Sequence, residues 1–159
     1  MSNKIKGSLE AIYTTPPLSK FLCDKVKENF KGKITEIVEP CAGDGSMMNV
    51  ISEEFPTIPL IGYDIDPHRD DIIQMDLMKN TLEYKKGRVI ITNFPFTKGL
   101  KMIYKCLEVS DFVVAIMSMT SIVSMDYDKY DVVDFYGIQK QGFSNGEKYS
   151  ISIFCVKNK

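Results

Sequence analysis

The stretch Glu39-Pro40-Cys41-Ala42-Gly43-Asp44-Gly45 decides the fold, because it separates an apolar run from a helical pattern. The run Ile34 to Val38 predicts a short buried strand before it, and the apolar spacing from Met47 to Phe55 predicts a helix after it. Gly43 and Gly45 allow a tight turn and a close approach of the backbone to a ligand. A lone G-x-G is more often an ordinary turn, but the order strand, glycine turn, helix is also the start of a nucleotide-binding sheet.

Helix and strand patterns alternate on both sides of this turn. Upstream, the apolar spacing from Leu18 to Phe30 predicts a helix that begins at Pro16-Pro17 and ends near Gly32. Downstream, strands are predicted at residues 59–63, 72–74, 88–92 and 112–117, with a helix over the apolar spacing from Leu100 to Leu107. Two last strands, 132–136 and 149–156, are joined by a turn that contains Gly142, Asn145 and Gly146, which predicts an antiparallel hairpin.

These elements predict an α/β fold, a Rossmann-like three-layer sandwich with a mostly parallel seven-stranded sheet and a C-terminal antiparallel hairpin. In such sheets ligands bind beyond the carboxyl ends of the strands, where the glycine turn lies. Because no repeat, low-complexity stretch or long linker interrupts the pattern, we expect residues 1–159 to form a single domain.

The composition is that of a globular protein. Of the 159 residues, 44% are hydrophobic and 26% are charged, and the formal net charge of -1 gives no overall attraction to a polyanion. Arginine occurs only as Arg69 and Arg88, which argues against bidentate reading of bases. The four cysteines lack CxxC spacing and His68 is the only histidine, so we expect buried thiols and no metal site. Without an apolar signal core or a run of membrane-spanning length, we expect no membrane association and a cytoplasmic location.

The tetrapeptide Asn93-Phe94-Pro95-Phe96 follows the predicted strand 88–92 and suggests chemistry on a planar amino group. The amide oxygen of Asn93 and the backbone carbonyl of Phe94 can both accept hydrogen bonds from one NH2 group. The ring of Phe96 can stack on the ring that bears this group. A purely structural turn is the competing interpretation of the tetrapeptide alone, but its position after a strand favours a catalytic loop.

Together with Asp64, Asp76 and the segment Tyr13-Thr14-Thr15-Pro16, these motifs resemble S-adenosylmethionine-dependent amino-methyltransferases. The resemblance is greatest to DNA adenine methyltransferases whose cofactor motifs precede the catalytic loop, and it covers residues 12 to 96. It implies that S-adenosylmethionine is the cofactor and that its methyl group goes to the exocyclic amino group of adenine in DNA. The implied catalytic loop is Asn93, Phe94, Pro95 and Phe96.

The resemblance also implies a cofactor site. Its residues would be Tyr13, Thr15, Pro16, Glu39, Cys41, Ala42, Gly43, Asp64, Ile65, Asp76, Leu77 and Asn93. Glu39 would hold the amino group of the methionine moiety, and Asp64 would accept both ribose hydroxyls, with Asp66 as the competing choice. Asp76 would accept a hydrogen bond from the amino group of the cofactor adenine. Ile65 and Leu77 would make apolar contacts with the faces of the adenine ring.

Two departures from the family pattern bear on the substrate. Phe94 stands where the DNA enzymes usually have proline, and ribosomal RNA adenine dimethyltransferases have a similar loop; the longer glycine turn and the Thr-Thr-Pro start favour DNA. The chain also ends about when the sheet is complete, where related DNA enzymes carry a target-recognition region. Residues 118–131 are expected to be gap-filling core or a flexible loop. Lys98, Lys101 and Lys105 lie at helical spacing. Phosphate contact is one interpretation of these lysines, and a solvated helix face is the favoured one.

Several functions fit the same loop. An adenine in RNA or the side-chain amide of a protein glutamine also presents a planar NH2 group, so fold and loop do not choose among these substrates. A different class of function is a cofactor-binding subunit that does not catalyse on its own and needs a specificity or partner chain. The partners expected are therefore DNA or RNA and, for the second class, another protein chain.

Overall fold

The structure is a computed structural model, and it describes residues 13–143, 146 and 148–159. Its elements run in the order α1 (Pro16–Asn29), β1 (Glu36–Glu39), α2 (Ser46–Glu54), β2 (Leu60–Asp64), β3 (Ile73–Gln74), β4 (Arg88–Asn93), α3 (Gly99–Leu107), β5 (Phe112–Ser118), the 3-10 helix η1 (Met119–Ser124), β6 (Tyr130–Gly142) and β7 (Lys148–Asn158). Each element overlaps a predicted one, apart from η1; β1, α2 and β2 are shifted by one or two residues, and β3 is one residue shorter. The predicted turn residue Asn145 lies outside the described residues.

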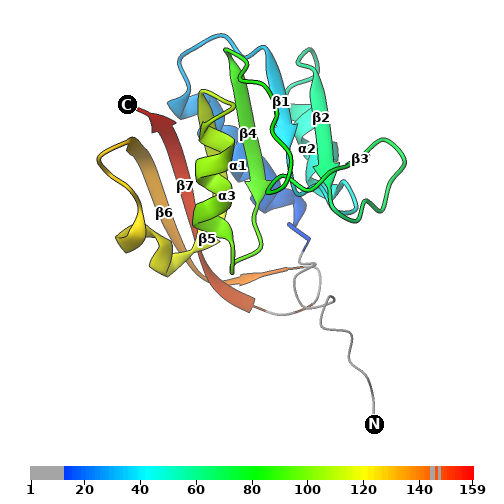
Figure 1. Cartoon of the computed structure of the whole chain (residues 1–159). Helices are drawn as coiled ribbons and strands as arrows, with labels where there is room; N and C mark the ends of the chain where they lie inside the picture. Colours follow the sequence, from blue (N-terminus) through cyan, green and yellow to red (C-terminus); the bar gives the residue numbers. More distant parts are fainter. Residues whose placement is uncertain (1–12, 144–145, 147) are drawn as a thin grey trace.

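Within the described residues, the strands form one seven-stranded sheet of order β3-β2-β1-β4-β5-β7-β6 (Figure 1). The first five strands are parallel, with Val38 of β1 opposite Ile61 of β2 and Ile90 of β4. Strand β7 is antiparallel to both β5 and β6. The predicted fold class, a mostly parallel sheet ending in an antiparallel hairpin, is confirmed.

Helices cover both faces of the sheet and give it three layers (Figure 1). Because successive strand residues point to opposite faces, Val89 and Ile91 pack with α1 and α2 while Ile90 packs with α3. Strand β5 is buried on both faces, as its uninterrupted apolar sequence predicts. The core therefore lies along β1, β4, β5 and β7, and the two helical layers hold the strand ends in place.

The connection after β5 is more ordered than a flexible loop. Residues Met119–Ser124 form η1, and Met125 is buried while Met119 is exposed. Met117, still in β5, is buried in the core beneath α3. The methionines of this region thus divide between gap-filling core, as expected, and an exposed turn.

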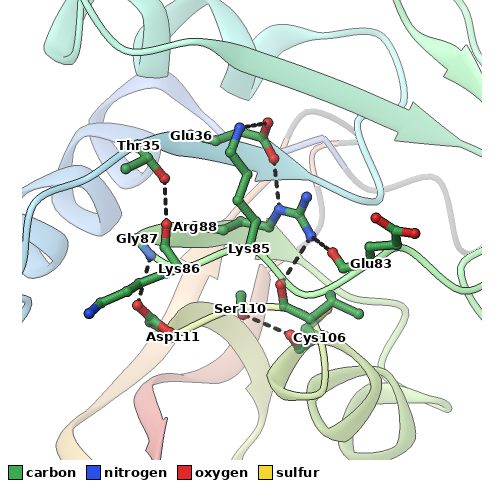
Figure 2. Close-up of polar contacts among 11 residues, drawn as sticks. Thr35, Glu36, Glu83, Lys85, Lys86, Gly87, Arg88, Cys106, Ser110 and Asp111 are labelled. Carbon is green, nitrogen blue, oxygen red and sulfur yellow. Dashed lines mark hydrogen bonds and ion pairs between the residues drawn. The ribbon is translucent and has the colours of Figure 1, made fainter.

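A polar network closes the sheet at the amino ends of β1 and β4 (Figure 2). Arg88 donates to Glu36 at 2.7 Å, to the carbonyl of Glu83 at 2.6 Å and to the carbonyl of Val109 at 3.0 Å. Lys85 donates to the other oxygen of Glu36 at 2.7 Å. Burial alone would raise the pKa of Glu36, but the hydrogen bonds from Lys85 and Arg88 lower it below its usual value. The network joins β1 and β4 to the segments that precede β4 and β5. It lies at the amino ends of the strands, so it is on the opposite side of the sheet from their carboxyl ends.

We predict that Arg88→Met lowers the free energy of unfolding by about 3 kcal/mol, because it leaves the buried Glu36 carboxylate with a single cationic partner. Urea denaturation monitored by circular dichroism measures the change. The double variant Glu36→Gln with Arg88→Met removes the unpaired charge and should recover a large part of the loss. A single variant as stable as the unmodified protein would contradict the assigned importance of this ion pair.

Candidate active site

Polar side chains from four neighbouring strands meet at one edge of the sheet. Glu39 is the last residue of β1, Asp64 of β2 and Asn93 of β4, and Asp76 follows β3 by two residues. Since these strands are parallel and adjacent in the sheet, their carboxyl ends lie side by side. The sequence motifs that were predicted separately are thus brought to a common site.

A cavity of about 430 Å³ opens at this edge, within the range of roughly 300–1,000 Å³ that small-molecule sites occupy. The predicted site residues that line it are Tyr13, Cys41, Gly43, Asp64, Ile65, Asp76, Leu77, Asn93, Phe94, Pro95 and Phe96. The cavity therefore joins the glycine turn, the two acids and the Asn-Phe-Pro-Phe loop in one space.

A second cavity, of about 30 Å³, lies beside the first and shares Tyr13, Cys41 and Asn93 with it. Its lining adds the predicted residues Glu39 and Ala42. Thr15 and Pro16 line neither cavity: Thr15 caps the amino end of α1 and Pro16 is its first residue. The structure therefore brings all the predicted site residues together except these two, which anchor the helix that follows.

The glycine turn is held by Asp64. Its carboxylate accepts hydrogen bonds from the backbone N–H of Gly43 at 2.8 Å and of Asp66 at 2.9 Å. Gly43 has φ +55°, and a Cβ at this position would lie 2.8 Å from the ring of Tyr13. Asp66 also lines the cavity, but its side chain is 87% exposed. Of the two competing acids, Asp64 is the one built into the turn.

Glu39 is a buried acid at the base of the site, with 1% of its surface exposed. Burial raises the pKa of Glu39 to about 8, although the hydroxyl of Thr92 and the N–H of Cys41 donate to its Oε1 atom and lower the pKa in part. The negative charge of Asp64 raises the pKa further. A cationic group in the neighbouring cavity would offset this desolvation and favour the ionised carboxylate.

The Asn-Phe-Pro-Phe loop is fixed at several points. The side chain of Phe94 is buried in the core cluster beneath α3, and the carbonyl of Pro95 accepts from the N–H of Lys98 at 3.0 Å as α3 begins. Phe96 is half-buried, and its ring meets that of Tyr149 edge to face at 6.0 Å between centroids. The amide Nδ2 of Asn93 donates to the hydroxyl of Thr14 at 3.3 Å. The loop thus presents Asn93 and Phe96 to the cavity while Phe94 and Pro95 hold its backbone.

Several residues at the site were not predicted from the sequence. They are Thr14, Pro40, Asp44, Ser46, Met47, His68, Met78, Thr97, Lys98, Met102 and Tyr149. Tyr149 comes from β7, far along the chain from the motifs, and nothing in its local sequence marks it. Lys98 was predicted only as part of a helix face; Lys101 and Lys105 do not line the cavity. A signal for Thr14 existed, since it lies inside the Tyr-Thr-Thr-Pro motif.

Other kinds of site find no support in the part of the chain that the structure describes. Cys23, Cys106 and Cys155 are buried and Cys41 is half-buried, and all are free thiols. Among the described residues, no group of three or more His, Cys, Asp or Glu side chains is placed to hold a metal ion. Within the same residues, no helix has the length and apolar character needed to cross a membrane.

Comparison with solved structures shows which fold this is. The chain superposes with a TM-score of 0.72 and 13% identity on a candidate RNA methyltransferase from Pyrococcus horikoshii, over 99% of this chain and 92% of that one. Magnesium protoporphyrin IX methyltransferase from Synechocystis, solved with bound S-adenosylmethionine, gives a TM-score of 0.66 and 10% identity over 91% of this chain and 79% of that one.

A third similar structure is a modification subunit of a candidate type I restriction enzyme from Vibrio vulnificus, with a TM-score of 0.65 and 11% identity over 96% of this chain. This chain spans 45% of that subunit. No protein-family model matches the chain, and no curated protein matches it by sequence. The chain has the Rossmann-like fold of S-adenosylmethionine-dependent methyltransferases.

We predict that Gly43→Ala destabilises the protein by more than the roughly 1–2 kcal/mol of a left-handed alanine, because its Cβ also meets the Tyr13 ring. Gly146→Ala, at φ +79° with nothing within 4 Å, supplies the backbone cost alone. Gly142→Ala has neither the backbone cost nor a steric contact, because Gly142 has no positive φ and no atom within 4 Å of the added Cβ. Thermal unfolding of the three variants measures the order, and equal losses for Gly43→Ala and Gly146→Ala would show that the contact with Tyr13 costs nothing.

Proposed function

We propose that the chain transfers a methyl group from S-adenosylmethionine to the exocyclic amino group of adenine in DNA. The observation that carries the proposal is that one cavity is lined both by the end of Asp64's strand and by Asn93-Phe94-Pro95-Phe96. A cofactor held by the first set of residues would lie next to an amino group held by the second.

The residues present fit this cofactor. Gly43 lines the cavity beside Tyr13, and because it has no side chain its backbone can lie close to a ligand. Glu39 is a buried acid suited to an ammonium group, and Asp64 has lone pairs beyond the two that accept from the turn. Asp76 and Leu77 also line the cavity, and they would give an adenine ring an acceptor and an apolar surface. S-adenosylmethionine, when bound, supplies a methyl group activated by its positively charged sulfur.

The chain's contribution to transfer is positioning. The Asn93 amide oxygen and the Phe94 carbonyl would accept from the target NH2 group, which directs the nitrogen lone pair toward the methyl carbon. Transfer would form a nitrogen–carbon bond as the carbon–sulfur bond breaks, and the electron pair of the broken bond would stay on sulfur. The methylated nitrogen then loses a proton to solvent, so no basic side chain is needed at the reacting atom. Phe96 would stack on the base, which a duplex must first release from its helical stack at a cost of a few kcal/mol.

Three other functions stay open as alternatives. The similar structures include both a candidate RNA methyltransferase and a restriction-enzyme modification subunit, so an adenine in RNA is one alternative. A protein glutamine amide fits the same acceptors. A cofactor-binding subunit that needs a partner chain is the third, supported by the structural similarity to a modification subunit.

The deciding experiment offers labelled S-adenosylmethionine to separate pools of unmethylated DNA, RNA and unfolded protein, with Asn93→Ala as the blank. Label in the DNA pool that is absent with the variant supports the proposal. Label in another pool names that polymer instead. No label in any pool, with cofactor binding confirmed by calorimetry, points to the subunit, and absence of cofactor binding refutes both the enzyme and the subunit.

We predict that Asn93→Ala abolishes transfer while leaving the Kd for S-adenosylmethionine nearly unchanged, because the amide acts on the target amino group. Asp64→Ala should weaken cofactor binding first, because it removes the acceptor that also holds the turn. Transfer at saturating cofactor and calorimetric Kd values separate the two effects. Equal loss of both properties in both variants would refute this division of roles.

We predict that cofactor affinity rises with pH between 6 and 8. Glu39, with a pKa of about 8, is largely neutral at pH 6 and becomes ionised as the pH rises, and only the ionised form attracts an ammonium group. Because a single group titrates, the affinity changes by no more than about tenfold per pH unit. Glu39→Gln should bind weakly at every pH and lose the slope, and the same slope in the variant would assign the titration to another group.

A further inference from the structure

Thr14 lies at the point where the amino-terminal segment meets the Asn93 loop. Its side chain is buried, with 6% of the residue exposed, and it lines the smaller cavity together with Glu39 and Asn93. The Nδ2 atom of Asn93 donates to the Thr14 hydroxyl at 3.3 Å. A buried hydroxyl from outside the catalytic loop thus contacts the amide on which the proposed reaction depends.

The position of Thr14 is set by α1 rather than by the loop. The carbonyl of Thr15 accepts from the N–H of Ser19 at 2.9 Å in the first turn of α1, and Leu18 and Leu22 of that helix are buried in the core. Threonine is branched at Cβ, which restricts its side-chain rotamers. The hydroxyl is therefore attached to the start of α1 and not to the Asn93 loop.

The chemistry of an amide gives this contact a purpose. When Oδ1 of Asn93 accepts from the target amino group, the NH2 end of the same side chain points the other way and needs an acceptor. The buried Thr14 hydroxyl supplies one for this half-buried amide. Donation from Nδ2 also polarises the amide and makes Oδ1 a better acceptor.

We propose that Thr14 is a positioning residue that holds the Asn93 side chain with its amide oxygen toward the target amino group. The inference rests on the proposed methyl transfer and adds to it a residue outside the catalytic loop. Thr14 itself touches neither the target nor the methyl group in this assignment, and it contributes to the rate through Asn93.

Two variants of Thr14 test the proposal. Thr14→Val keeps the shape and removes the hydroxyl, and Thr14→Ser keeps the hydroxyl. With the polymer that the wild-type protein methylates, we expect Thr14→Val to lower kcat roughly fivefold to tenfold, as the loss of one hydrogen bond does, with the Kd for S-adenosylmethionine unchanged. Thr14→Ser should restore most of the rate.

Nuclear magnetic resonance tests the contact without any activity. The side-chain amide of Asn93 gives one pair of proton signals, identified by its absence in Asn93→Ala. We expect Thr14→Val to shift this pair and to speed its exchange with water, and Thr14→Ser to leave it nearly in place.

Each outcome has a separate meaning. A wild-type protein that methylates no polymer refutes the proposed function, while the amide signals still decide whether Thr14 holds Asn93. Unchanged signals in Thr14→Val, or full kcat in that variant, overturn the positioning role. A weaker Kd for S-adenosylmethionine with kcat intact would also overturn it, because it would place the Thr14 hydroxyl on the cofactor.

Discussion

The rest of the structure depends on the parallel pairing of β1 with both β2 and β4. Val38 stands opposite Ile61 on one side and Ile90 on the other, so the three strands run in the same direction and end at the same edge. Hydrophobic burial on both faces of β1 and β4 fixes that register, because a slip by one residue would exchange the side chains of the two helical layers. Glu39 and Asn93 are neighbours for this reason and not because their loops fold toward each other.

The site is largely assembled by the protein itself. The Asp64 carboxylate joins β2 to the glycine turn by accepting a hydrogen bond from the N–H of Gly43. The carbonyl of Gly43 also accepts a hydrogen bond from the N–H of His68. Buried Phe94 fixes the loop after β4 from beneath. A ligand that enters such a preorganised cavity loses less free energy to the ordering of loops than one that must fold them. Glu39 is the exception, because burial raises its pKa to about 8 and only a neighbouring cation would offset the cost of ionising it there.

Much of the fold could be predicted from the sequence because its strongest signals are local. Uninterrupted apolar residues marked β5, and two glycines marked the turn before α2. The length of β6 was underestimated, since Gly137 and Lys140 break its apolar pattern and the register shifts between Ile138 and Gln141. Strand β7 is longer than predicted because it extends into the polar residues Lys148, Lys157 and Asn158. Tyr149 could not be assigned to the site, because its place at the cavity depends on antiparallel pairing with distant strands. The roles given to the individual site residues stay predictions.

Strand β7 lies between β5 and the edge strand β6 and is antiparallel to both. Among the described residues, β6 pairs in the sheet with β7 alone, while Lys25 and Asn29 of α1 form hydrogen bonds with its side chains. If the hairpin opened as a unit, the backbone edge of Phe112–Ser118, the most apolar strand, would be exposed along its whole length. Such an edge is a template for pairing with other chains, which makes detachment of this hairpin the step from which aggregation of the protein would begin.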